Sequence, residues 1–106
     1  MKDNKEFIMR KTEMEEGCVR FNISGHINAT TAMEFELALN KEIALGHVNI
    51  IINMAHVRFL SSVGIRIILK TYKQCEKAGG LFKISAPSDP VRNVIGLSSL
   101  DQLLLQ

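Results

Sequence analysis

The chain has 106 residues, of which 46% are hydrophobic and 23% are charged, a size and composition typical of one globular domain. The formal net charge is only +2, and Lys and Arg are interspersed with Asp and Glu, so no basic stripe points to nucleic-acid binding. No apolar run approaches the roughly 18 residues that a membrane-spanning helix needs. We expect a single soluble domain over residues 1–106, located in the cytoplasm, that contacts neither nucleic acid nor membrane.

Two strands are predicted at the start of the chain. Residues 7–12 form the first. In the second, Val19, Phe21 and Ile23 alternate with polar residues, which is the period of a half-buried strand. The acidic segment 13–17, which ends in glycine, predicts a hairpin turn between them.

A first helix is predicted over residues 31–45, after the segment 24–31 interrupts the strand pattern. Phe35, Leu39 and Ile43 recur at intervals of four and predict its buried face. Its outer side is expected to carry four charged residues, Glu34, Glu36, Lys41 and Glu42.

A buried central strand over residues 48–54 and a second helix over residues 62–77 follow. The strand sequence Val-Asn-Ile-Ile-Ile-Asn-Met is nearly continuous in apolar character, which is typical of a strand covered on its faces. The helix is expected to bury five residues, Ile65, Ile68, Leu69, Tyr72 and Cys75.

The last elements are a strand over residues 81–85 and a helix that begins near Pro90 and ends near Leu97. Four leucines beyond it are expected to pack back on the domain, because an exposed leucine stripe would promote aggregation; they are Leu100, Leu103, Leu104 and Leu105. The order β-β-α-β-α-β-α predicts an α/β domain whose mixed sheet has four or five strands, parallel across each β-α-β connection.

The sequence contains no recognisable catalytic or metal-binding motif. It lacks a Gly-x-Ser-x-Gly elbow and a P-loop, and His26, His47 and His56 are too scattered for metal-ligand spacing. His26 is the best lone candidate for catalysis, but a single loop histidine is more often solvated. Cys18 and Cys75 are interpreted as reduced thiols, with Cys75 on the buried side of its helix. We expect no enzymatic activity, metal or cofactor.

The sequence Leu-Ser-Ser-Val-Gly-Ile at residues 60–65 joins the central strand to the second helix. A serine at the start of a helix can cap the first-turn N–H groups, which have no intrahelical partners. The positive end of the helix dipole would also stabilise a phosphate attached there. The local pattern leaves both interpretations of Ser61 and Ser62 open, an N-cap alone or a phosphorylation site.

Four segments resemble the STAS domain family of sulfate transporters and anti-sigma-factor antagonists. Residues 24–32, Ser-Gly-His-Ile-Asn-Ala-Thr-Thr-Ala, are similar to the family pattern G-x-(I/L)-(D/N)-x-x-T-A. Residues 59–65, Phe-Leu-Ser-Ser-Val-Gly-Ile, are similar to F-(L/M)-D-S-S-G-L. The glycine pair at residues 79–80 and the closing segment 96–100 also match, so the resemblance covers nearly the whole chain.

The resemblance implies a STAS-like sheet with helices packed mainly on one face, and a role as an anti-sigma factor antagonist in a partner-switching pathway. The partner in such a pathway is a serine kinase that acts as the anti-sigma factor; it phosphorylates a serine at the start of the second helix, and a cognate phosphatase restores it. That serine corresponds to Ser62, with Ser61 as a competing acceptor. The implied partner-binding residues are His26, Asn28, Thr31, Arg58, Ser61, Ser62, Val63 and Arg66.

The chain departs from the family pattern at three positions. Ser61 replaces the usual acid, Val63 replaces the usual second serine, and Asn28 replaces the loop acid, so the site carries less negative charge. These departures keep open a second hypothesis, a STAS-type structural subunit of a larger signalling or lipid-transport complex that is not phosphorylated. The sequence does not determine the oligomeric state, for which we expect a monomer.

Overall fold

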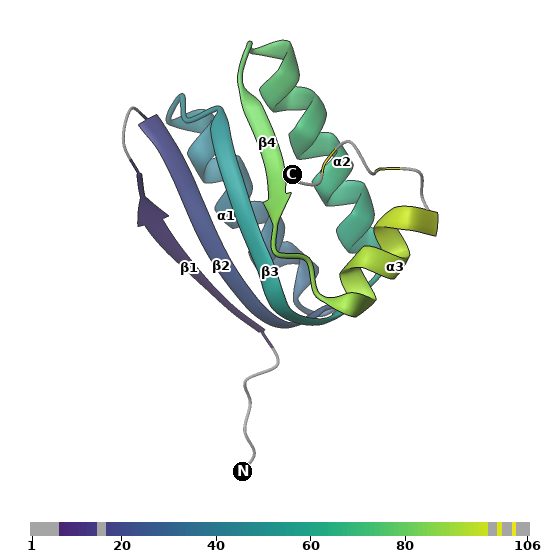
Figure 1. The fold of residues 1–106 in the computed structure, drawn as a ribbon. Helices are drawn as coiled ribbons and strands as arrows, with labels where there is room; N and C mark the ends of the chain where they lie inside the picture. The colour runs from purple at the N-terminus through teal and green to yellow at the C-terminus, as the bar shows by residue number, and fades with distance from the viewer. Residues whose placement is uncertain (1–6, 15–16, 98–99, 101–102, 104–106) are drawn as a thin grey trace.

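A computed structural model describes residues 7–14, 17–97, 100 and 103. The elements follow the predicted order (Figure 1) and are β1 (Phe7–Glu13), β2 (Cys18–Ile27), α1 (Ala32–Ala44), β3 (Asn49–Leu60), α2 (Ser62–Lys77), β4 (Leu81–Ser85) and α3 (Asp89–Leu97).

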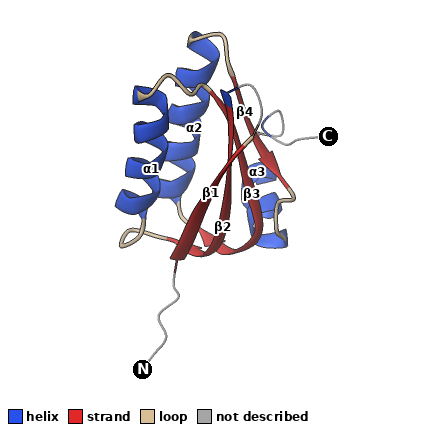
Figure 2. Ribbon diagram, turned by 90° about the vertical axis from the view of Figure 1, so that its left-hand side faces the viewer, coloured by secondary structure: helices blue, strands red, loops and turns tan. Residues whose placement is uncertain are grey.

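The sheet has the strand order β1-β2-β3-β4. β1 and β2 form the predicted antiparallel hairpin, whereas β3 is parallel to both of its neighbours. Helices α1 and α2 cover one face of the sheet, and α3 lies on the opposite face (Figure 2). The prediction of an α/β domain with a mixed sheet and helices mainly on one face is therefore confirmed.

The core lies between the sheet and the α1–α2 layer. The predicted alternation in β2 is confirmed, because Val19, Phe21 and Ile23 are all buried. Ile50 and Ile52 of β3 lie in register beside Val19 and Phe21, so the apolar side chains of neighbouring strands share one face. Burial of a side chain of this size contributes about 1.5–3 kcal/mol.

Both strands that meet at the centre of the sheet are longer than predicted. β2 continues to Ile27, into the segment 24–31 that is predicted to interrupt the strand, and β3 continues to Leu60, beyond its predicted end at residue 54. Their pairing continues past two register shifts, between Asn22 and Ser24 and between Gly25 and His26 of β2. The bulges break the two-residue period of exposure in β3. Residues 55–60 also lack the nearly continuous apolar character from which this strand is predicted.

The buried face of α2 differs from the predicted one by a small rotation. Ile67 and Thr71 are buried, although neither is predicted to be. Three residues of the predicted buried face are only partly buried, namely Ile65, Leu69 and Tyr72. The Thr71 hydroxyl donates to the Ile67 carbonyl at 2.9 Å, which satisfies the hydroxyl inside the core. Cys75 is buried as predicted, and this burial raises the pKa of its thiol to about 11.

Residues after α3 pack back on the domain where the structure describes them. Leu103 is fully buried and Leu100 is partly buried against the core. The predictions for Leu104 and Leu105 concern residues outside the described part of the chain.

The prediction that Glu42 lies on the outer side of α1 is wrong. Its side chain is only 3% exposed, and its two carboxylate oxygens contact Lys11 Nζ at 3.0 Å and His47 Nδ1 at 2.7 Å. Burial acts to raise the pKa of Glu42, but the hydrogen bonds with His47 and Lys11 outweigh it and hold the pKa below its ordinary value. A charged residue is tolerated there because both oxygens have partners.

We predict that Glu42→Gln destabilises the fold by about 1–3 kcal/mol, since it removes a buried acceptor of charge-assisted hydrogen bonds. The pKa of Glu42 is lower in the folded chain, so its contribution is present above the ordinary pKa of 4.5 and is lost as the pH falls through the lower folded value. Urea denaturation at several pH values measures both effects. Glu36→Gln is the control, because the Glu36–Lys70 pair is exposed; an equal loss in both variants would contradict the prediction.

Candidate functional site

The start of α2 is fixed to the end of β2 by the residue that precedes the helix. Ser61 is the N-cap, with an extended backbone, and its Oγ accepts a hydrogen bond from the Gly64 N–H at 3.2 Å. Its own N–H donates to the Ile27 carbonyl at 2.9 Å. Side chain and backbone of one serine therefore join the helix to the neighbouring strand end.

Gly64 allows the first turn of α2 to lie directly on the core. A Cβ atom at this position would stand 2.7 Å from Leu60 Cδ1 and 2.8 Å from Ile27 Cγ2, both closer than real contacts allow. Because no side chain separates the helix from the strand ends, the direction of the first turn is tightly constrained.

Ser62 is the first residue of α2 and is exposed. The first intrahelical hydrogen bond runs from the Ile65 N–H to the Ser61 carbonyl at 3.0 Å. The N–H groups of Ser62 and Val63 precede it and have no partner among the residues that the structure describes. Arg66 is exposed one turn further along, so a group attached to Ser62 would meet two donors and the positive end of the dipole.

The loop between β2 and α1 lies beside this helix start and is shaped by two polar side chains. Asn28 Oδ1 accepts hydrogen bonds from the N–H groups of Thr30 and Thr31, at 2.9 and 3.1 Å. The Thr31 hydroxyl donates to the His26 carbonyl at 2.7 Å and accepts from the Asn28 N–H at 3.0 Å. Thr31 is 8% exposed, so its side chain determines the shape of the loop and adds little to the exposed surface.

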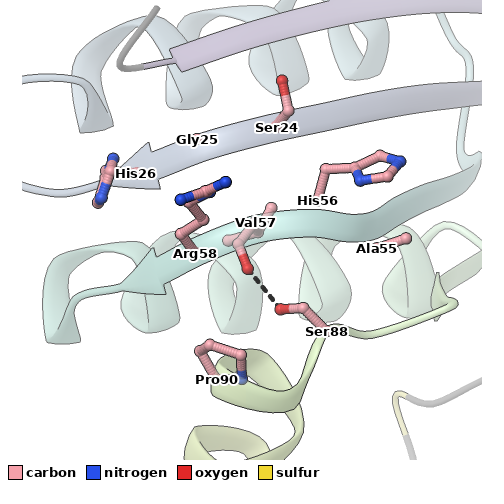
Figure 3. Close-up of a pocket in the computed structure, with 9 residues that line it drawn as sticks. All are labelled: Ser24, Gly25, His26, Ala55, His56, Val57, Arg58, Ser88 and Pro90. Carbon is pink, nitrogen blue, oxygen red and sulfur yellow. Dashed lines mark hydrogen bonds between the residues drawn. The ribbon is translucent and has the colours of Figure 1, made fainter.

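The structure divides the eight residues of the expected partner surface into two groups. Six of them belong to the start of α2 and the adjoining loop, namely Asn28, Thr31, Ser61, Ser62, Val63 and Arg66. His26 and Arg58 are exposed near the same strand ends, but they line a depression on the sheet face that carries α3 (Figure 3).

A groove lies between α1 and α2 beside Val63, the residue that follows Ser62, and the sequence patterns do not predict it. It has a volume of about 290 Å³, and its lining includes Met33 of α1 and Val63 and Arg66 of α2. Met33 is 70% exposed, and Leu37, one turn along α1, is 60% exposed. A signal was present in the sequence, since both apolar residues fall outside the predicted buried stripe of that helix.

Within the described part of the chain, no group of three or more His, Cys, Asp or Glu side chains is placed to hold a metal ion. Over the same residues, every helix is too short or too polar to cross a membrane.

A model of the STAS domain family matches residues 9–105, and the chain belongs to this family. An anti-sigma factor antagonist from Mycobacterium paratuberculosis has a similar structure, with a TM-score of 0.83 and 27% sequence identity over 98% of this chain and 87% of that chain. The anti-sigma factor antagonist SpoIIAA in its unphosphorylated form gives a TM-score of 0.82 at 20% identity, over 92% and 86% of the two chains.

SpoIIAA, a cell fate determinant of Bacillus, is also similar in its phosphorylated form, with a TM-score of 0.77 and 19% identity over 92% of this chain and 89% of that chain. The expected family and fold are thereby confirmed, and the structural neighbours include anti-sigma factor antagonists.

We predict that alanine substitutions of the two adjacent serines change the free energy of unfolding by different amounts. Ser61→Ala removes the side-chain cap and should lower the free energy of unfolding by about 0.5–2 kcal/mol. Ser62→Ala changes an exposed side chain and should alter it by less than about 0.5 kcal/mol. Chemical denaturation of both variants measures the difference; a larger loss in Ser62→Ala would show that the cap is assigned to the wrong residue.

Proposed function

We propose that this chain is an anti-sigma factor antagonist that binds a serine kinase acting as the anti-sigma factor, and that phosphorylation of Ser62 weakens this complex. The observation that carries the proposal is the exposed Ser62 hydroxyl at the start of α2, in a chain of the STAS family. Similar structures of SpoIIAA, in phosphorylated and unphosphorylated form, support a regulated rather than a catalytic role. Sigma factors act in the cytoplasm, where the proposal places the chain.

The geometry favours Ser62 over Ser61 as the acceptor. Ser61 Oγ is engaged by the Gly64 N–H and is half-buried, so its modification would disturb the helix start. Ser62 is exposed and its hydroxyl takes no part in the cap. A kinase can reach Ser62 without altering the fold.

Phosphorylation would lower the affinity for a partner, whereas the free domain can accommodate the added charge. It adds a charge of about −1.5 to −2 at pH 7. In the free domain the N–H groups of Ser62 and Val63 and the helix dipole stabilise this charge, and Arg66 lies one turn away. A partner that covers the site must remove the water around this charge, which costs free energy. A cost of only about 2.7 kcal/mol lowers the affinity a hundredfold.

The groove between α1 and α2 completes the proposed partner surface. Met33 lines this groove together with Val63, and Leu37 is exposed one turn further along α1. A partner that covers these side chains would bury apolar surface, which favours association. Ser62 would then lie at the edge of an apolar contact, where a new charge is most costly to cover.

The alternative, an unphosphorylated STAS-type subunit of a larger signalling or lipid-transport complex, is favoured by one observation. Ser61, Val63 and Asn28 stand where the family pattern has an acid, a serine and an acid, so features that would assist a kinase are absent here. Co-purification from the native cell followed by mass spectrometry discriminates between the two: a serine kinase supports the first function, and a transporter ATPase supports the second.

We predict that incubation with the co-purifying kinase and ATP adds one phosphate to the chain. Intact-mass and peptide mass spectrometry should locate it on Ser62. The phosphate should be absent in Ser62→Ala and retained in Ser61→Ala, which serves as the matched control. Dissociation constants from calorimetry should rise about a hundredfold on phosphorylation.

Unchanged phosphate incorporation in Ser62→Ala would refute the acceptor assignment. Equal affinity of the modified and unmodified chains for the kinase would refute the regulatory role.

A further inference from the structure

The exposed side of α2 carries a row of positive side chains that begins one turn after Ser62. The row consists of Arg66, Lys70, Lys73 and Lys77, all of them exposed. Their spacing of four, three and four residues places them on one side of the helix, within about 60° of arc and over roughly 17 Å of its length. We call these four residues the basic stripe.

The basic stripe faces away from the sheet. The buried residues of α2 occupy the other side of the helix, and they are Gly64, Ile67, Ile68, Thr71 and Cys75. Figure 2 shows α1 and α2 side by side on one face of the sheet, and no described element covers the outer side of α2. The stripe is therefore open to a partner along its whole length.

The stripe concentrates positive charge on one helix. α2 carries four cations and one carboxylate, a net charge of +3, whereas the whole chain has a formal net charge of only +2. The carboxylate belongs to Glu76 and accepts a hydrogen bond from the Tyr72 hydroxyl at 2.9 Å. Among the described residues, Lys70 pairs with Glu36 of α1, and the other three cations of the stripe have no ion-pair partner.

This arrangement is unfavourable for the helix itself. Like charges three or four residues apart on a helix repel one another, and the stripe contains three such pairs in succession. The Glu36–Lys70 pair is exposed and relieves only part of this repulsion. Departures from local stability of this kind are expected where a surface has a function.

The composition of α2 favours a protein over a membrane as the partner. A helix that lies on a membrane inserts large apolar side chains beside its cations. None of the large hydrophobic side chains that are exposed in the described part of the chain belongs to α2. The stripe is also continuous with the proposed partner surface, because Arg66 and Lys70 line the groove between α1 and α2.

We propose that the basic stripe binds an acidic surface of the serine kinase, so that the interface extends along α2 as far as Lys77. The inference rests on the proposed function, because it concerns the same partner. Complementary charges on two proteins accelerate their encounter and fix their relative orientation. Ser62 would then lie at one end of an elongated contact that the stripe aligns.

The stripe gives phosphorylation a second way to weaken the complex. A phosphate on Ser62 would stand one turn from Arg66, at the end of the stripe. Its charge of about −1.5 to −2 offsets nearly half of the four positive charges. Phosphorylation should therefore slow association as well as weaken the completed contact.

The test measures the association rate constant of the chain with the co-purifying kinase, carrying a fluorophore, by stopped-flow mixing at several salt concentrations. Lys73→Glu combined with Lys77→Glu should lower this constant at least about tenfold at roughly 0.05 M salt, and the loss should disappear near roughly 0.5 M, where exposed charges are screened. The dissociation rate constant should change less than about threefold, since charges at the rim of an interface act mainly on association.

The matched control is Lys41→Glu combined with Arg92→Glu. It makes the same change in net charge at exposed positions of α1 and α3, and it should slow association less than about threefold, because steering depends on where the charges lie. Circular dichroism checks that each variant is folded.

Four outcomes would overturn the inference. Unchanged association of the stripe variant, in a wild-type chain that does bind the kinase, would refute the inference and leave the proposed function intact. Equal slowing by the stripe variant and the control would show that the kinase responds to net charge alone. Failure of the wild-type chain to form a complex would refute the proposed function and this inference together. Binding to phosphatidylserine vesicles that the stripe variant loses, with its kinase association unchanged, would make the stripe a membrane-contacting surface.

Discussion

The attachment of the first turn of α2 to the end of β2 is the constraint on which the rest of the site depends. Ser61 joins the two elements through its N–H and its Oγ, and Gly64 allows them to approach without an intervening side chain. The next residue, Ser62, therefore faces solvent at the positive end of a helix that cannot easily reorient. A hydroxyl on a mobile loop would lack this fixed electrostatic environment.

The ends of β2 and β3 lie close to exposed features on both faces of the sheet. On one face, α1 and α2 bury the core and leave the helix start and its groove exposed. On the other, the bulges of β3 turn His56 and Arg58 outward beside α3. The parallel pairing of β2 and β3 brings the two regions to one end of the sheet.

Local sequence patterns were sufficient for the order of the elements and for the limits of α2. They were sufficient because Val19, Phe21 and Ile23 follow a strict two-residue period and the serines and glycines mark helix ends. The patterns did not predict features that depend on contacts between elements distant in sequence. β3 extends past its apolar run because it pairs with β2 through bulges, and Glu42 is buried because Lys11, distant in sequence, reaches it.

The candidate site was predictable to the extent that it is local. Ser61 and Ser62 are recognisable at the start of a helix, but sequence alone does not tell which of them forms the cap; the hydrogen bond from Gly64 does. The groove beside Met33 and the depression around Arg58 depend on how distant elements pack. Neither could be assembled from residue spacing along the chain.

The most direct test of this account measures the second pKa of a phosphate installed on Ser62 by phosphoserine incorporation, using phosphorus NMR. A helix start that stabilises the dianion should hold this pKa below its ordinary value of about 6, and below that of an unfolded peptide spanning residues 58–66. A value equal to that of the peptide, or above it, would contradict the central claim.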